Sequence, residues 1–146
     1  MTIYFDMDGT IANHYGVESW LEFLQNEDAY PYRTAAPLVD VERFKKVLEN
    51  LKAEGYRLGI ISWLSRNGSQ NYNKAVRQAK KEWLFSKITI KWDELHIVKY
   101  GTPKNSVCRD KNGILFDDEE RNRKNWKGVA FDEKNIIEKL NSLIMS

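Results

Sequence analysis

Four aspartates lie in two pairs at the ends of apolar segments of the chain. Asp6 and Asp8 follow the apolar run IYF in the stretch FDMDGT, and Asp117 and Asp118 end the stretch GILFDD. Carboxylates brought together repel one another unless a cation neutralises them, and hard carboxylate oxygens are ligands that Mg²⁺ prefers. The two pairs therefore predict a Mg²⁺ site to which all four aspartates contribute.

A nucleophile and its partners can be assigned among the same residues. With Mg²⁺ present, a negative carboxylate can approach a phosphate, so Asp6 can attack phosphorus and form an aspartyl-phosphate. Ser62, which ends the apolar stretch GIIS, and Lys104, in the stretch YGTPK, offer a hydroxyl and an ammonium to the transferred oxygens. Backbone N–H groups after Asp6 can join them, because a glycine lets this loop turn sharply. The loop residues expected to contact phosphate are Met7, Gly9 and Thr10.

The elements that must position these groups are strands that alternate with helices. We predict strands at 3–5, 56–62, 95–100, 113–118 and 128–131. We also predict four helices. One follows an Asp40 N-cap, one covers 71–85, one has Pro103 as its first helical residue, and one follows an Asp132 N-cap. This alternation is typical of a parallel sheet with helices on both faces, a three-layer Rossmann-like α/β fold. Such sheets bind ligands at the carboxyl ends of their strands, where Asp6, Ser62 and Asp117 are expected.

One segment departs from this alternation. Residues 13–40 are predicted to form a small insertion, with one helix near Val17–Leu24 and then the irregular stretch DAYPYRTAAP. The insertion is too short for an independent domain, and a chain of 146 residues suits one domain of ordinary size. We therefore expect a single domain over residues 1–146.

The motifs together resemble those of a known family. FDMDGT is similar to the first motif of the haloacid dehalogenase-like (HAD) hydrolases, a superfamily of phosphatases that use an aspartate nucleophile. Ser62 in GIIS is similar to the second motif, Lys104 in YGTPK to the third, and the acidic pair in ILFDD to the fourth. The motifs occur in family order over residues 2–118, and the predicted last strand and helix fit the family's fold.

The resemblance implies a role for each motif residue. Asp6 would be the nucleophile and Asp8 the general acid/base, with the Asp8 backbone carbonyl on the metal. Asp118, with Asp117, would complete the Mg²⁺ site. An acid at position 8 resembles the phosphatase branch, because the dehalogenases usually lack it and need no Mg²⁺. Asp8 would protonate the leaving oxygen and then activate water, a contribution of roughly 10²–10⁴ in rate. The implied activity is hydrolysis of a phosphomonoester.

Two further lysines compete for the third motif. Lys104 lies closer to Asp117 in sequence than the motif lysine does in many family members. Lys111 lies immediately before the predicted strand, where its side chain would point past the site, and Lys99 ends a strand expected at the sheet edge. We assign the motif to Lys104 and keep Lys111 as the alternative.

Because its insertion is short, the chain resembles the branch of the family that has a minimal cap or none. In that branch we expect the site to stay open. Trp20, Tyr30, Tyr32 and Trp63 are candidate substrate contacts, although core or loop positions would explain them equally well. Arg66 could meet a second anionic group or could lie in a solvated loop. The substrate is expected to be a nucleotide or another small phosphomonoester, with a polynucleotide end or a phosphoprotein as alternatives.

Composition limits the partners. A net charge of +2, with bases and acids interleaved, does not indicate a nucleic-acid surface, although it leaves one open. No apolar run approaches the ~18 residues of a membrane span, and no signal-peptide pattern begins the chain. The two histidines lack zinc-ligand spacing, and the single cysteine predicts no disulfide. We expect a cytoplasmic protein without a membrane partner, acting on a phosphorylated small molecule, with its oligomeric state open.

A receiver-type signalling domain is the alternative from another class. Such domains also combine acids, a phosphorylatable Asp, a Ser or Thr and a Lys, and they bind Mg²⁺ to switch rather than to turn over. In receivers the acidic pair comes with the first strand and the phosphoryl acceptor with a later one. Here the order is reversed, and Asp8 supplies a hydrolytic base two residues from Asp6.

Overall fold

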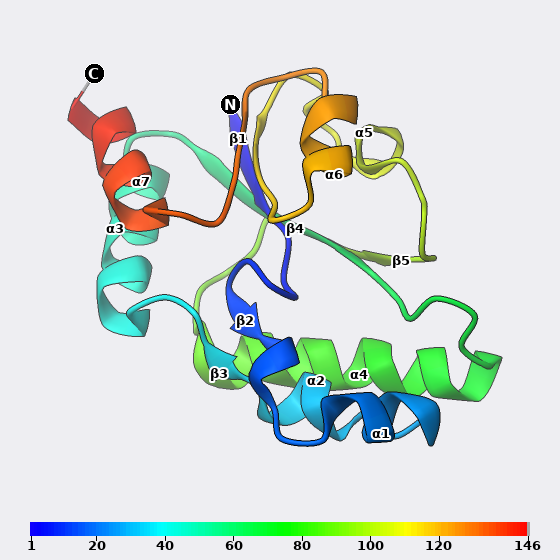
Figure 1. Cartoon of the computed structure of the whole chain (residues 1–146). Coiled ribbons are helices and arrows are strands. Elements are labelled where there is room, and N and C mark those ends of the chain that lie inside the picture. The colour runs from blue at the N-terminus through cyan, green and yellow to red at the C-terminus, as the bar shows by residue number, and fades with distance from the viewer. Residues whose placement is uncertain (146) are drawn as a thin grey trace.

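Five parallel strands form the central sheet of the computed structural model, which describes residues 1–145. Their spatial order is β5-β4-β1-β6-β7, so β1 lies at the centre (Figure 1). The strands are β1 (Thr2–Phe5), β4 (Arg57–Trp63), β5 (Glu94–Val98), β6 (Ile114–Phe116) and β7 (Ala130–Phe131). The predicted parallel sheet with flanking helices is confirmed.

Helices cover both faces of the sheet. Alternate strand residues such as Phe5 and Ile60 pack in one core with helices α3 (Val41–Ala53), α7 (Ile136–Met145) and the last turns of α4 (Gln70–Lys87). Tyr4, Ile61 and Leu115 point to the opposite face, where a second cluster includes Trp126 beside the short helices α5 (Lys104–Val107) and α6 (Glu120–Asn125). The result is three layers, in which α4 and α5 lie on opposite faces of the sheet.

Two helix starts differ from the prediction. Asp40 does cap α3, since its side chain accepts the Arg43 N–H. Asp132, however, does not cap α7: Asn135 has a left-handed φ of 55°, so the helix begins only at Ile136. At α5, Pro103 is the extended residue before the helix rather than its first helical residue. Helix α6 was not predicted at all.

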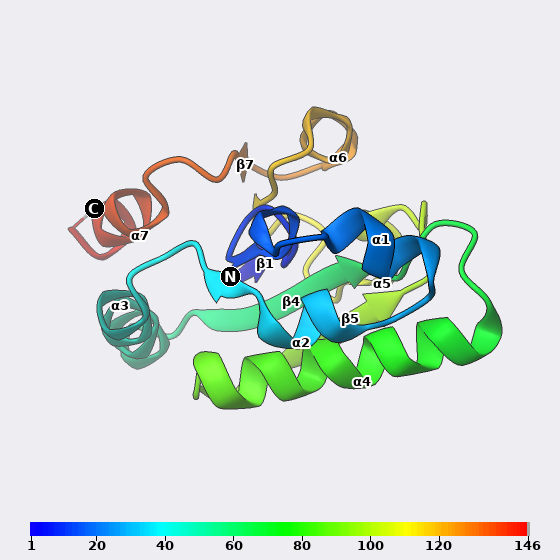
Figure 2. The same ribbon diagram turned by 60° about the horizontal axis from the view of Figure 1, so that its bottom comes forward.

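The insertion is more structured than the sequence indicates. Strands β2 (Ala12–Asn13) and β3 (Ala36–Pro37) pair antiparallel at its base, and a 3₁₀ turn η1 (His14–Gly16) follows β2. Two helices, rather than one, then complete it: α1 (Trp20–Gln25) and α2 (Tyr30–Thr34). Helix α2 packs against α4, and α1 lies against α2 and η1 (Figures 1 and 2). With five residues and no clear period, α2 leaves too little pattern to be read from sequence.

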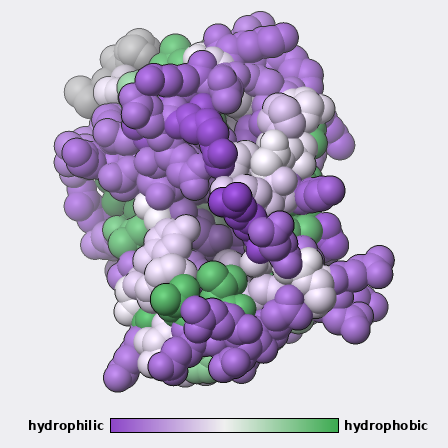
Figure 3. Space-filling model, turned by 45° about the vertical axis from the view of Figure 1, so that its right-hand side comes forward, coloured by the Kyte–Doolittle hydropathy of each residue, from purple (hydrophilic) through white to green (hydrophobic). Residues whose placement is uncertain are grey.

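The surface is mostly hydrophilic on the face of Figure 3, with apolar side chains gathered in its lower part. That part of the molecule holds the insertion and α4 in Figure 1. Within residues 1–145, no helix combines the length and the apolar character that crossing a membrane requires.

Candidate functional site

Three neighbouring strands end at the predicted site. Asp6 follows β1, Ser62 is the next-to-last residue of β4, and Asp117 follows β6. These strands are adjacent and parallel, so their carboxyl ends lie at one edge of the sheet. All three side chains are buried, Ser62 and Asp117 completely. The grouping predicted from the strand ends is therefore present.

Three carboxylates gather at this edge. One oxygen from each of Asp6, Asp117 and Asp118 lies within 4.8 Å of the others. The Thr10 hydroxyl lies 3.0 Å from Asp6 Oδ2 and 3.2 Å from Asp118 Oδ1, and it accepts the Asp118 backbone N–H at 3.1 Å. Thr10 thus ties the loop after β1 to the loop after β6, a role beyond the phosphate contact expected from sequence.

Burial makes the cluster electrostatically strained. Desolvation, together with the charge of Asp6, raises the pKa of Asp117 to about 6 and that of Asp118 to about 8. Each negative charge added here lacks water to stabilise it and meets a like charge nearby. The cluster therefore favours either bound protons or a bound cation.

Lys104 is the cation at the centre of this edge. Its ammonium donates to Asp6 Oδ1 at 3.0 Å, to Asp117 Oδ2 at 2.6 Å and to the Ile61 carbonyl at 3.0 Å. Burial alone would lower the pKa of Lys104, but the charges of Asp6 and Asp117 outweigh it and raise that pKa. All three ammonium protons are used, which locks the lysine in place.

The alternative lysines lie elsewhere. Lys111 is exposed and donates to the Asn105 carbonyl, and Lys99 is exposed as well. Lys104 is the lysine that contacts the aspartates, as predicted.

A second buried lysine, Lys80, was missed by the sequence analysis. Its ammonium donates to Asp8 Oδ2 at 2.8 Å, to Ser62 Oγ at 2.7 Å and to the Trp63 carbonyl at 2.7 Å. Its side chain is 1% exposed. The available signal was its place in α4: Lys80 lies on the buried stripe with Val76, Ala79 and Trp83, where a charged residue needs a partner.

The Asp8 and Ser62 side chains are consequently arranged differently from the prediction. The Asp8 carboxylate pairs with Lys80 and lies outside the cluster, so three of the four acidic side chains gather there, and the metal contact implied for the Asp8 backbone carbonyl stays a prediction. Ser62 is fully buried, and its hydroxyl accepts a hydrogen bond from Lys80, a partner that was not predicted. Asp8 thus has the buried Lys80 ammonium as its partner and no place among the like charges of the other three aspartates.

The loop after β1 uses its own N–H groups to fold. The Met7 carbonyl accepts the N–H of Thr10, and Gly9 donates its N–H to the Ala12 carbonyl. The Gly9 and Thr10 N–H groups are therefore used within the loop, contrary to expectation. The Met7 side chain is buried in the core, and the contact expected of its backbone N–H with phosphate stays a prediction. Gly9 has a φ of 82°, and a Cβ there would collide with the Asp118 carboxylate. Glycine is thus required for the two acidic loops to meet.

A cleft of about 180 Å³ opens over Asp6 and Asp8. Four predicted contacts line it, namely Trp20, Tyr32, Trp63 and Arg66. Its wall also includes side chains that were not predicted as contacts, which are His14, Tyr15, Tyr100, Glu119 and Asn122.

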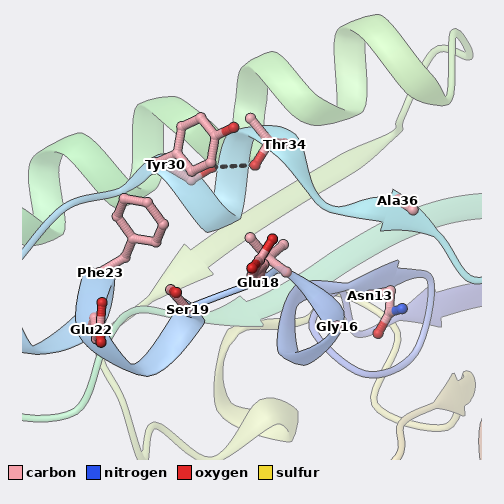
Figure 4. Close-up of a pocket in the computed structure, with 10 residues that line it drawn as sticks. Asn13, Gly16, Glu18, Ser19, Glu22, Phe23, Tyr30, Thr34 and Ala36 are labelled. Atoms are coloured by element: carbon pink, nitrogen blue, oxygen red, sulfur yellow. Dashed lines mark hydrogen bonds between the residues drawn. The ribbon is translucent and has the colours of Figure 1, made fainter.

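Tyr30 does not line this cleft. It faces a separate pocket of about 580 Å³ within the insertion, with Phe23, Glu22 and Ser19 (Figure 4). Positions 30 and 32, two residues apart, differ here because α2 turns Tyr32 towards α4 and the site while Tyr30 stays exposed.

Comparison with known proteins adds no family to this picture. Neither a scan against protein-family models nor a search of the curated proteins found a match to the chain. The function therefore has to be inferred from the residues of the site.

Proposed function

We propose that the protein is a Mg²⁺-dependent phosphatase of the haloacid dehalogenase-like type, which hydrolyses a phosphomonoester through an aspartyl-phosphate on Asp6. The observation that carries the proposal is the set of contacts around Asp6. This carboxylate ends the central strand, faces a cleft, and lies against a locked lysine and two further acids. Such a constellation suits a carboxylate nucleophile for a phosphate ester.

The donor atoms fit Mg²⁺. All three clustered groups are hard carboxylates, and the raised pKa of Asp118 marks a place where added positive charge is favourable. Asp6 and Asp118 would hold the ion. Asp117 would act mainly through its charge, because both of its oxygens already accept hydrogen bonds, from Lys104, Asn122 and the Glu119 N–H. Bound Mg²⁺ would supply the positive charge that lets a carboxylate approach a phosphate.

Asp6 and Asp8 have different roles in the proposed reaction. An Asp6 oxygen forms the bond to phosphorus as the ester P–O bond breaks, and Asp8 in its acid form gives its proton to the leaving oxygen. Water then attacks the aspartyl-phosphate and gives a proton to Asp8, which releases phosphate and restores Asp6. Lys80 holds Asp8 by Oδ2, while Oδ1 accepts no hydrogen bond from the described residues, so that this oxygen is available to carry the proton.

Phosphate release from para-nitrophenyl phosphate tests the proposal. Release should require Mg²⁺, stop with a chelator, and be abolished in Asp6→Asn, which keeps the shape of the side chain. Asp8→Asn should form phosphoenzyme that decays slowly. Full activity in chelator, or substantial activity of Asp6→Asn, would refute the assignment. A stable phosphoprotein without turnover would instead identify the receiver-like alternative.

A further inference from the structure

Aromatic side chains surround the cleft above Asp6 and Asp8. They come from two walls: the insertion contributes four, and the end of β4 and the segment after β5 contribute one each. The six aromatic residues that line the cleft are His14, Tyr15, Trp20, Tyr32, Trp63 and Tyr100. A small pocket with so many rings is suited to a flat apolar group rather than to a sugar alone.

The insertion wall is built on a stacked pair. His14 and Tyr32 stack at 4.2 Å with an interplanar angle of 18°, and both are buried. Tyr15 meets His14 edge-on at 5.1 Å and Trp20 edge-on at 5.2 Å, yet remains 53% exposed. Tyr15 therefore presents a ring that neighbours orient but do not cover.

The opposite wall is held in place by Trp63. Its indole N–H donates to the Thr102 carbonyl at 2.8 Å, and Tyr100 packs edge-on against it at 4.9 Å. Arg121 and Lys104 also lie over Trp63, but they line the neighbouring pocket of about 220 Å³ and not this cleft. Trp63 thus separates the two pockets and contributes a fixed ring to the cleft.

The charges at the cleft limit the number of phosphates. The acids that line it are Asp6, Asp8 and Glu119, and the one Lys or Arg side chain among its described lining residues is the exposed Arg66. Lys104 and Lys80 balance Asp6 and Asp8, and a bound Mg²⁺ can balance one phosphoryl group, but the lining offers only Arg66 to the further charges of a triphosphate or a polynucleotide. The substrate should carry a single phosphate.

We infer that the substrate is a nucleoside monophosphate, whose base lies between the insertion rings and the Trp63–Tyr100 wall while its phosphate meets Asp6. This inference rests on the proposed phosphatase function and adds the substrate class to it. Stacking accounts for recognition because every nucleobase has a π-face that aromatic side chains can contact.

Adenosine 5′-monophosphate and ribose 5-phosphate form the decisive pair, since they differ only in the base. The kcat/KM for the nucleotide should exceed that for the sugar phosphate by about tenfold or more, in the range that one stacked base contributes. Tyr15→Ala should reduce this ratio mainly through the KM of the nucleotide. Tyr15→Phe, which keeps the ring, should preserve it, and Phe85→Ala on an exposed part of α4 is the matched control.

Binding of adenosine, measured by calorimetry against ribose, separates failure of this inference from failure of the phosphatase proposal. Turnover of ribose 5-phosphate as fast as the nucleotide, with no adenosine binding, would overturn the nucleotide assignment and leave the phosphatase intact. Adenosine binding without phosphate release from either ester would refute the phosphatase function and with it the substrate assignment. Faster release from a 5′-phosphorylated oligonucleotide or from adenosine triphosphate would also contradict a mononucleotide substrate.

Discussion

Lys104 and Lys80 hold two sides of one site with nearly the same kind of partners. Each is buried, and each donates to one aspartate of the loop after β1, to one carbonyl near the end of β4 and to one further side chain. They arrive from opposite faces of the sheet, Lys104 on α5 and Lys80 on α4 (Figure 2). Aspartates only two residues apart are thereby given separate counter-charges.

The two lysines differ in what else they hold. Lys104 joins two carboxylates of the core, whereas Lys80 joins one carboxylate and the Ser62 hydroxyl and lies 5.1 Å from the Tyr32 ring of the insertion. The Asp8 side is also less buried, with the Asp8 side chain 19% exposed against 0% for Asp117. The Asp6 side therefore depends on the core, and the Asp8 side depends on α4 and the insertion.

Replacing Lys104 should have the largest effect. Lys104→Met leaves Asp6 and Asp117 buried without their counter-charge, so we expect a loss of about 3–5 kcal/mol in the free energy of unfolding. Turnover should fall by orders of magnitude. Urea denaturation and phosphate release measure the two effects, with the exposed Lys111→Met as control. A larger loss in Lys111→Met would move the third motif to that residue.

Replacing Lys80 should be milder for stability and still severe for turnover. Water can reach Asp8, so we expect Lys80→Met to cost about 1–3 kcal/mol of stability, with turnover reduced by roughly 10²–10⁴ if Asp8 needs its partner. Lys80→Arg should restore part of both, and Lys81→Met is the adjacent control.

A double-mutant cycle sharpens this comparison. If the Lys80–Asp8 pair is the interaction lost, then Asp8→Asn and Lys80→Met should be non-additive by about 0.5–3 kcal/mol. Additive effects would mean that Lys80 acts through Ser62 and the Trp63 carbonyl instead.

The metal-free protein should lose stability as the pH rises. The pKa values of Asp117 and Asp118 are raised from 3.8 to about 6 and about 8, so the folded state holds protons that the unfolded state releases. The stability that these groups contribute is complete below about pH 4 and is lost as the pH approaches 8. Thermal unfolding in chelator checks this, and a midpoint that rises over this range in the wild type but not in Asp118→Asn would contradict it.

Added Mg²⁺ should counter this loss. An ion concentration of 100 times its Kd would stabilise the folded state by about 2.7 kcal/mol, or about 8 °C in the midpoint at about 3 °C per kcal/mol for a chain of this length. The gain should be larger at pH 8 than at pH 5, where protons compete for the carboxylates. An equal gain in Asp118→Asn would place the ion elsewhere.

Arg66 should give the smallest effect. Unlike the two lysines it is exposed, so solvent and salt screen its charge. Arg66→Ala should lower kcat/KM by only about threefold, equivalent to about 0.6 kcal/mol, in the range of exposed ion pairs. The difference should vanish at high salt, and a loss comparable to that of Lys80→Met would show that Arg66 binds a second anionic group.

The sequence by itself determined the sheet, the edge at which the aspartates gather, and most of the residues that meet there. Parallel strands alternating with helices bring their carboxyl ends together, so residues at strand ends such as Asp6, Ser62 and Asp117 were predictable from local patterns alone. The burial of Lys104 against two of those acids followed from the same topology.

Only the tertiary structure decided the partner of Asp8, the place of Ser62 and the walls of the cleft. Lys80 lies 72 residues from Asp8 in the chain, and its side chain reaches the site because α4 packs across the end of β4. The choice between Tyr30 and Tyr32 likewise depended on how the short helix α2 docks on α4. Contacts of this kind are set by how separate elements pack against one another, and no local periodicity records them.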